Sequence, residues 1–175
     1  AQWAQGCEMA SARFHAGGAV VAAADASAHR MLVVAGMDSN RRLLDSCELY
    51  DAVVDRWLME EARLLEEMRC CAAPIAGGSA VLAVQLDDEE KTRCALLDVR
   101  SSSACWQPMA SAPIASRWHT VAAVGEHSVV MFGGWDEDAD TDTAQLYDAR
   151  ADRWSERAEW RLPAPSSGHC AVVIG

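Results

Sequence analysis

The stretch Leu49–Trp57 reads LYDAVVDRW, and residues 146–154 read LYDARADRW. The two nonapeptides begin 97 residues apart and are identical at seven of nine positions. A weaker third copy lies between them, with Leu97-Asp98 in place of Tyr-Asp, followed by Trp106. Self-similarity at a fixed spacing is the sequence signature of repeat architectures, so this repeat decides the fold.

Tryptophans mark the length of the repeating unit. Successive members of the series are separated by 54, 49 and 48 residues, and they are Trp3, Trp57, Trp106 and Trp154. A unit of about fifty residues is typical of the longer propeller repeats and exceeds the roughly 40–45 residues of the WD type, whose closing Trp-Asp these units also lack.

Short apolar runs that end at turns precede each Tyr-Asp or Leu-Asp. The longer runs cover residues 31–36, 80–86 and 128–134, and shorter ones precede them at 19–22, 72–75 and 120–124. Runs this short, rich in β-branched residues and bounded by turn residues, favour buried strands over helices. Each unit therefore predicts two strands, a glycine turn, a polar loop, a strand with Tyr-Asp and a strand with Trp, which together form a four-stranded antiparallel sheet.

Glycines and aromatic residues recur at fixed places in the unit, which indicates structural roles. A glycine after a buried strand lets the backbone bend or approach a neighbour closely. Large rings suit packing between adjacent sheets, because each buries much area while its polar atom keeps a partner at the edge. The predicted structural residues are Gly36, Tyr50, Asp51, Trp57, Asp98, Trp106, Gly133, Gly134, Tyr147, Asp148 and Trp154.

This pattern of double glycine, variable loop, Tyr-Asp, turn and Trp resembles the kelch repeat family. The unit that ends at Trp154 matches fully, whereas the unit that ends at Trp57 has Ala35-Gly36 for the double glycine. The middle unit departs most, with Gln85-Leu86 in place of the glycines. The resemblance implies a β-propeller with one four-stranded blade per repeat.

The resemblance also implies a division of the chain. Residues 1–175 form one kelch propeller region, with blades at about 10–57, 68–106 and 115–154. Residues 1–9 would be the last strand of a preceding blade and residues 165–175 the first strand of a following one. Propellers close with about four to eight blades. Three accounts are open: a stretch of a larger, six-bladed propeller, a dimer that pools its blades into a six-bladed ring, or pairing of the first and last strands into one blade.

The net charge of the chain indicates which classes of binding partner are compatible with it. The chain of 175 residues carries 26 acidic and 15 basic residues, for a net charge of −11 and a pI of about 4.8. Repulsion from phosphates argues against nucleic acid or an anionic membrane surface. No apolar segment approaches the roughly twenty residues of a membrane span. A protein partner, with a basic one matching the charge best, is expected.

Cysteine usage indicates the compartment. The seven cysteines are odd in number, contain no CxxC motif and lie mostly in apolar runs. Free cysteine in such runs acts as a small hydrophobic residue. The pattern does not match a disulfide framework, so a reducing, cytoplasmic location is expected.

Polar residues near the start of each unit are the candidate partner-binding residues. The set comprises Arg13, His15, Arg69, Arg117, Trp118, His119 and His169. One hypothesis is a ring of side chains at one mouth of the propeller that contacts a partner. The alternative is that these side chains bond the backbone of a neighbouring sheet. A metal ring is disfavoured, since each histidine belongs to a different unit and no carboxylate or cysteine accompanies it at ligand spacing.

Two acidic loops and one helix-prone segment complete the candidates. The loops cover residues 87–90 and 136–142. A calcium loop that starts at Asp136 would need glycine and glutamate where Thr141 and Tyr147 stand, so we expect a solvated loop that steers a basic partner. Residues 59–68 predict either a short helical turn or an irregular crossover.

Motifs of enzyme chemistry are lacking. The chain has no Gly-x-Ser-x-Gly, phosphate loop or HExxH, and no cofactor is expected. The resemblance implies a protein-interaction module, as in substrate receptors of ubiquitin ligases or cytoskeletal scaffolds. Its alternatives are a kelch-like enzyme, namely a metal-dependent oxidase or lyase, and a structural subunit of a large complex. Tyr50 and Tyr147, the two tyrosines, occupy structural positions, which argues against a radical site.

Overall fold

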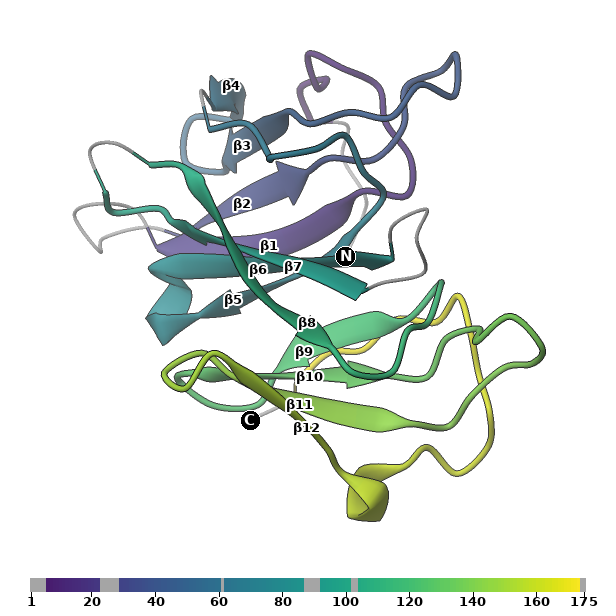
Figure 1. The fold of residues 1–175 in the computed structure, drawn as a ribbon. Coiled ribbons are helices and arrows are strands. Elements are labelled where there is room, and N and C mark those ends of the chain that lie inside the picture. The colour runs from purple at the N-terminus through teal and green to yellow at the C-terminus, as the bar shows by residue number, and fades with distance from the viewer. Residues whose placement is uncertain (1–5, 23–28, 61, 87–91, 102–103, 174–175) are drawn as a thin grey trace, which may run out of the picture.

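The computed structural model describes residues 6–22, 29–60, 62–86, 92–101 and 104–173, and within them the chain is all-β (Figure 1). Its strands form three four-stranded antiparallel sheets. In each sheet the strands lie side by side in chain order, which is the predicted meander. The prediction of one four-stranded antiparallel sheet per repeat is confirmed.

Each repeat supplies one sheet. Sheet 1 comprises β1 (Gly17–Ala22), β2 (His29–Val34), β3 (Cys47–Asp51) and β4 (Arg56–Glu60). Sheet 2 comprises β5 (Cys71–Ile75), β6 (Ala80–Leu86), β7 (Thr92–Asp98) and β8 (Trp106–Ala112). Sheet 3 comprises β9 (Thr120–Ala123), β10 (Ser128–Phe132), β11 (Ala144–Asp148) and β12 (Arg153–Glu156). Two short 3-10 helices are η1 (Ala76–Gly78) and η2 (Ala158–Trp160).

The sheets are arranged through their first strands. β1 contacts β5 and β5 contacts β9, so the three first strands lie next to one another. The fourth strands lie at the opposite edge of each sheet. The sheets follow one another in chain order through the molecule (Figure 1).

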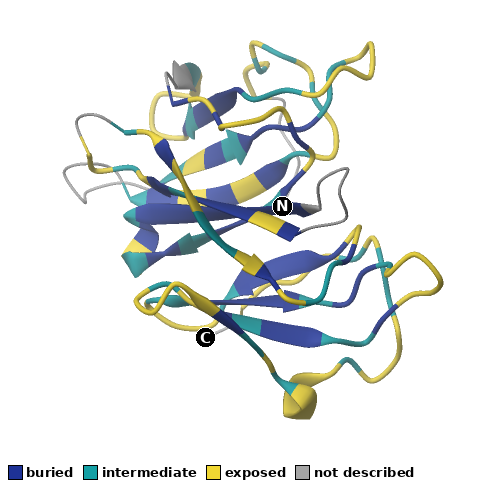
Figure 2. Ribbon diagram, in the orientation of Figure 1, coloured by how far each residue is buried: buried dark blue, intermediate teal, exposed yellow. Residues whose placement is uncertain are grey.

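Two apolar layers hold the sheets together (Figure 2). Between sheets 1 and 2, aliphatic residues such as Leu32 and Val34 pack against Val81 and Leu97. Between sheets 2 and 3, Leu82 and similar residues pack against Val129, Met131, Tyr147 and Trp154. Strand side chains alternate between faces, so sheet 2, covered on both sides, has nearly continuous apolar strands.

The repeated aromatic residues pair across neighbouring strands, and those of sheet 3 also pack against sheet 2. Tyr147 lies opposite Trp154, with ring centroids 5.1 Å apart, and Tyr50 lies opposite Trp57 at 5.0 Å. Tyr147 is fully buried because its face of sheet 3 packs on sheet 2. Tyr50 is only half-buried, since no described sheet packs on the corresponding face of sheet 1.

Glycines after the second strand have the predicted role of close approach. Gly134 has a φ of 103°, and a Cβ there would lie 2.6 Å from the Arg117 carbonyl oxygen. Gly36 has a φ of 96°, and its Cβ would lie 2.8 Å from the Phe14 carbonyl oxygen. Both positions require glycine, because the backbone of the segment entering the sheet passes directly against them.

The two ends of the described chain differ from the prediction of strands at 1–9 and 165–175. Residues 6–9 and 165–173 have no strand structure, because they make isolated contacts with their neighbours and no continuous ladder of backbone hydrogen bonds. Residues 1–5, including Trp3, and residues 174–175 lie outside the described residues.

Both end segments nevertheless repeat contacts made elsewhere in the chain. The indole Nε1 of Trp57 donates to the Cys7 carbonyl at 3.1 Å, as that of Trp154 donates to the Ala110 carbonyl of β8 at 2.9 Å. The Gly134 amide donates to the Ser166 carbonyl just as the Gly36 amide donates to that of Met68, each at 2.8 Å. Residues 6–9 thus contact the tryptophan of sheet 1 in the same way that the end of β8 contacts the tryptophan of sheet 3.

The helix-prone segment is irregular. Residues 56–60 belong to β4, and the described residues 62–68 form no helix. Ala62, Leu64 and Met68 are buried against the first two sheets, so the segment is a packed crossover. No helix among the described residues is long and apolar enough to cross a membrane.

Candidate functional site

The loops that follow β2 and β10 lie at the same end of the sheets (Figure 1). In sheet 1, Phe14 bridges to Met37 of this loop, and in sheet 3, Arg117 bridges to Trp135. We call the surface formed by residues 13–16, 35–46, 116–119 and 133–143 the loop face. It contains most of the predicted partner-binding residues.

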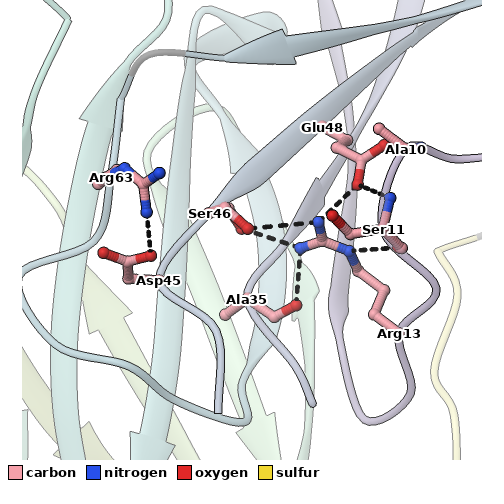
Figure 3. Close-up of polar contacts among 8 residues, drawn as sticks. All are labelled: Ala10, Ser11, Arg13, Ala35, Asp45, Ser46, Glu48 and Arg63. Atoms are coloured by element: carbon pink, nitrogen blue, oxygen red, sulfur yellow. Dashed lines mark hydrogen bonds and ion pairs between the residues drawn. The ribbon is translucent and has the colours of Figure 1, made fainter. Parts of the chain in front are cut away.

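The side chain of Arg13 is buried and bonds to groups of its own sheet, so it is not part of the surface (Figure 3). Its guanidinium lies 2.6 Å from Glu48 Oε1, and the two side chains are 1% and 0% exposed. It also donates to the carbonyls of Ala35 and Ser46, each at 2.9 Å. Glu48 in turn accepts the amides of Ala10 and Ser11, at 2.7 and 3.0 Å. Arg13 thus bonds backbone, as the alternative expected, but the backbone is that of its own sheet and not of a neighbouring one.

In sheet 3, neutral side chains bond the backbone at the positions that correspond to Arg13 and Glu48. Ser116 takes the place of Arg13, and its hydroxyl donates to the Gly133 carbonyl at 3.1 Å. Gln145 takes the place of Glu48 and accepts the Ile114 amide at 2.9 Å. Arg117 is thus the structural counterpart of Phe14. The spacing in the sequence had instead placed Arg117 at the position of Arg13.

His15 and Trp118 are structural counterparts and are exposed. Both have left-handed backbone, with φ values of 54° and 52°. Such a conformation is an outlier for bulky residues and persists only where neighbours enforce it. The Trp118 carbonyl accepts the Gly168 amide at 2.8 Å, which fixes this turn.

Aromatic pairs stand at both positions. The Trp118 ring is 54% exposed and tilts against Trp135, with centroids 6.4 Å apart. Phe14 is 43% exposed and its ring lies 5.1 Å from that of His15. Exposed aromatic rings with polar surroundings are characteristic of protein-binding surfaces.

His119 is buried directly behind Trp118. Its Nδ1 lies 2.7 Å from the Ser116 carbonyl, and its Nε2 has no hydrogen-bond partner among the described residues. Burial lowers the pKa of His119, and the nearby His169 lowers it further, while the carbonyls of Ser116 and Val84 oppose the shift. His119 is therefore neutral at physiological pH and unavailable to a partner.

The remaining predicted residues are spread out. His169 is half-buried, and both of its ring nitrogens lack a partner within the described part of the chain. Arg117 is exposed on the loop face, and Arg69 is exposed before β5. The structure thus brings Arg117, Trp118 and His119 together, and it does not assemble the seven residues into one ring of exposed side chains.

The loops of the loop face carry opposite charge in sheets 1 and 3. Both begin with an aspartate, Asp38 or Asp136, whose Oδ1 accepts backbone amides of its own turn. The sheet 1 loop continues with Arg41 and Arg42, which are exposed. The sheet 3 loop continues with exposed acidic residues at 137, 138 and 140.

The acidic loop holds no metal-type arrangement. Across the described ranges, no group of three or more His, Cys, Asp or Glu side chains is placed to hold a metal ion. The other acidic loop, residues 87–90, lies outside the described residues.

None of the seven cysteines, all in described segments, forms a disulfide. Burial raises the pKa of Cys94 to about 12 and that of Cys71 to about 11, so these thiols are protonated and unreactive.

Four surface residues escaped the sequence prediction: Phe14, Arg41, Arg42 and Trp135. Trp135 follows the double glycine directly, and the position after a fixed backbone turn at a loop face is a signal that could have identified it. The sequence matches no protein-family model and has no significant similarity to a curated protein. Function is therefore argued from the residues themselves.

Proposed function

We propose that this chain is a protein-interaction module, a kelch-type propeller region that binds a partner protein through the loop face. The repeat pattern and the three similar sheets, joined through their first strands, support the propeller assignment. The six-bladed ring remains part of this proposal, as does the role of adaptor for a ubiquitin ligase or scaffold in the cytoplasm.

The observation that carries the proposal is the exposed tryptophan at position 118. It is 54% exposed, has left-handed backbone and lies against a second tryptophan, Trp135. In comparison, the repeat tryptophan Trp154 is buried between sheets and serves the fold. Tryptophan is enriched among residues that dominate binding energy, because one ring covers a large area. A strained, exposed tryptophan contributes little to stability, so a role in binding explains it best.

The chemistry of the site favours binding over catalysis. Within the described chain the loop face contains no nucleophile paired with a base, because His119 is buried and bonded to a backbone carbonyl. Its exposed groups are rings, guanidinium groups and carboxylates, which recognise polypeptide side chains. One loop carries exposed arginines and the other carries exposed carboxylates, so a bound peptide with charges of both signs would be held in one orientation.

Selection of binding peptides tests the proposal. The protein is immobilised, and peptides are selected from a random displayed library and measured individually by fluorescence anisotropy. Trp118→Ala should weaken the selected peptides about tenfold or more. The matched control is Trp160→Ala, since Trp160 is 41% exposed on the outer edge of sheet 3 and should be neutral. Selected peptides that bind both variants as tightly as the unchanged protein would contradict the loop face as the binding site.

A further inference from the structure

The loop-face hairpin of sheet 3 lies beside an aromatic pair, the exposed Trp118 and the half-buried Trp135, and carries several carboxylates. Trp135 begins this hairpin and bridges to Asp140, and Trp118 lies against Trp135. Asp138 and Asp140 are exposed in the same hairpin. The Asp136 Oδ1 accepts the amides of residues 138 and 139, which fixes the turn and its charges.

Cations are attracted to tryptophan faces, and tryptophan is the best of the aromatic side chains for this contact. Neighbouring carboxylates add charge attraction at a distance of several ångströms. Guanidinium and ammonium groups are the cations that polypeptides carry. The exposed Trp118, packed on Trp135 and near the carboxylates of the hairpin, is therefore complementary to an arginine or lysine side chain.

We propose that Trp118, Trp135 and the acidic hairpin 136–140 receive an arginine or lysine side chain from a basic segment of the partner protein. The inference rests on the proposed function and names the partner chemistry at one part of the loop face. The corresponding hairpin of sheet 1 carries Arg41 and Arg42, which balance its aspartates, so it attracts the same cation less. The basic residue is thus directed to sheet 3, and the net charge of −11 supports its approach.

The test uses a fluorescein-labelled hexa-arginine peptide as the probe, with hexa-glutamate as the opposite charge. Anisotropy is measured at low and at physiological salt. Hexa-arginine should bind and hexa-glutamate should not. Trp118→Ala should weaken hexa-arginine about threefold to tenfold through loss of the cation–ring contact. Asp138→Asn/Asp140→Asn should weaken it similarly and reduce its salt dependence.

Matched variants separate this site from general attraction to an acidic protein. Glu8→Gln/Glu126→Gln removes two exposed carboxylates outside the loop face and should leave binding within about twofold. Trp160→Ala should be neutral, and Arg41→Gln/Arg42→Gln should leave or slightly raise the affinity. Circular dichroism of each variant confirms folding, and the aspartate variant keeps the test valid if Trp118→Ala unfolds.

Hexa-arginine that binds the loop-face variants and the unchanged protein equally would overturn the inference. It would also be overturned if the selected peptides depended on Trp118 but were acidic or apolar, and in that case the proposed binding function would stand. If the selected peptides bind Trp118→Ala as tightly as the unchanged protein, both this inference and the proposed binding function of the loop face would be overturned.

Discussion

The Tyr147 hydroxyl donates a 2.8 Å hydrogen bond to Asp152 Oδ1, and the same carboxylate accepts the Ala110 amide of β8 at 2.8 Å. One carboxylate therefore ties the nonapeptide of sheet 3 to the last strand of sheet 2. The first nonapeptide repeats the arrangement, with Tyr50 bonded to Asp55 at 2.8 Å and the Cys7 amide at 3.1 Å. The repeat in sequence is a repeat of bonds between neighbouring elements.

Removing the Tyr147 hydroxyl should destabilise the protein more than removing that of Tyr50. Tyr147→Phe removes the hydrogen bond of a fully buried tyrosine and should lower the free energy of unfolding by about 1 kcal/mol. Tyr50→Phe removes a bond of the same length at an exposed site, where water replaces the donor, so its effect should be smaller. Urea denaturation of both variants measures the difference, and equal losses would contradict the role of burial.

The Arg13–Glu48 pair should be replaceable by the neutral pair of sheet 3. Glu48→Gln alone leaves a buried guanidinium without its carboxylate and should lower the free energy of unfolding by about 3 kcal/mol. Arg13→Ser with Glu48→Gln installs the side chains found at Ser116 and Gln145, and the loss should be smaller than for Glu48→Gln. A double-mutant cycle measures the coupling. Losses that simply add would show that the two side chains act independently.

Glycine at position 134 should be irreplaceable. Gly134→Ala places a Cβ 2.6 Å from the Arg117 carbonyl at a φ of 103°, so it should lower the free energy of unfolding by more than about 2 kcal/mol. Gly18→Ala is the control, because nothing lies within 4 Å of its Cβ and alanine suits a strand better. Thermal unfolding compares the two, and a tolerated Gly134→Ala would rule out the proposed close approach.

Strand positions could be predicted because apolar runs and the Tyr-Asp and Trp residues recur at fixed spacing. The strands at 17–22, 80–86 and 128–132 lie within a few residues of the predicted runs. The strands expected at the two ends are absent from residues 6–9 and 165–173, because a strand also needs a continuous ladder of hydrogen bonds with a neighbour, and spacing within one unit contains no information about it.

The site was predictable only in part. Sequence spacing aligns Arg13 with Arg117, whereas the hydrogen bonds align Arg13 with Ser116. In extended chain, a shift of one residue exchanges the buried and exposed faces. Arg13 is accordingly buried, and the predicted ring is reduced to the exposed Arg117 and Trp118 with His119 behind them. Trp118 was predicted, but its contact with Trp135 joins two segments that are brought side by side only by the fold.

Protonation of His119 should weaken the fold as the pH falls. Burial lowers the pKa of folded His119 below its ordinary value of about 6.5, so below that pH the unfolded chain takes up a proton that the folded chain excludes. This contribution to the free energy of unfolding is therefore constant above about pH 7, falls with pH below 6.5 by at most about 1.4 kcal/mol per pH unit, and levels off below the folded pKa. His119→Gln keeps a donor for the Ser116 carbonyl and should flatten the profile measured by urea denaturation between pH 5 and 8. A slope that persists in His119→Gln would assign the proton uptake to another group.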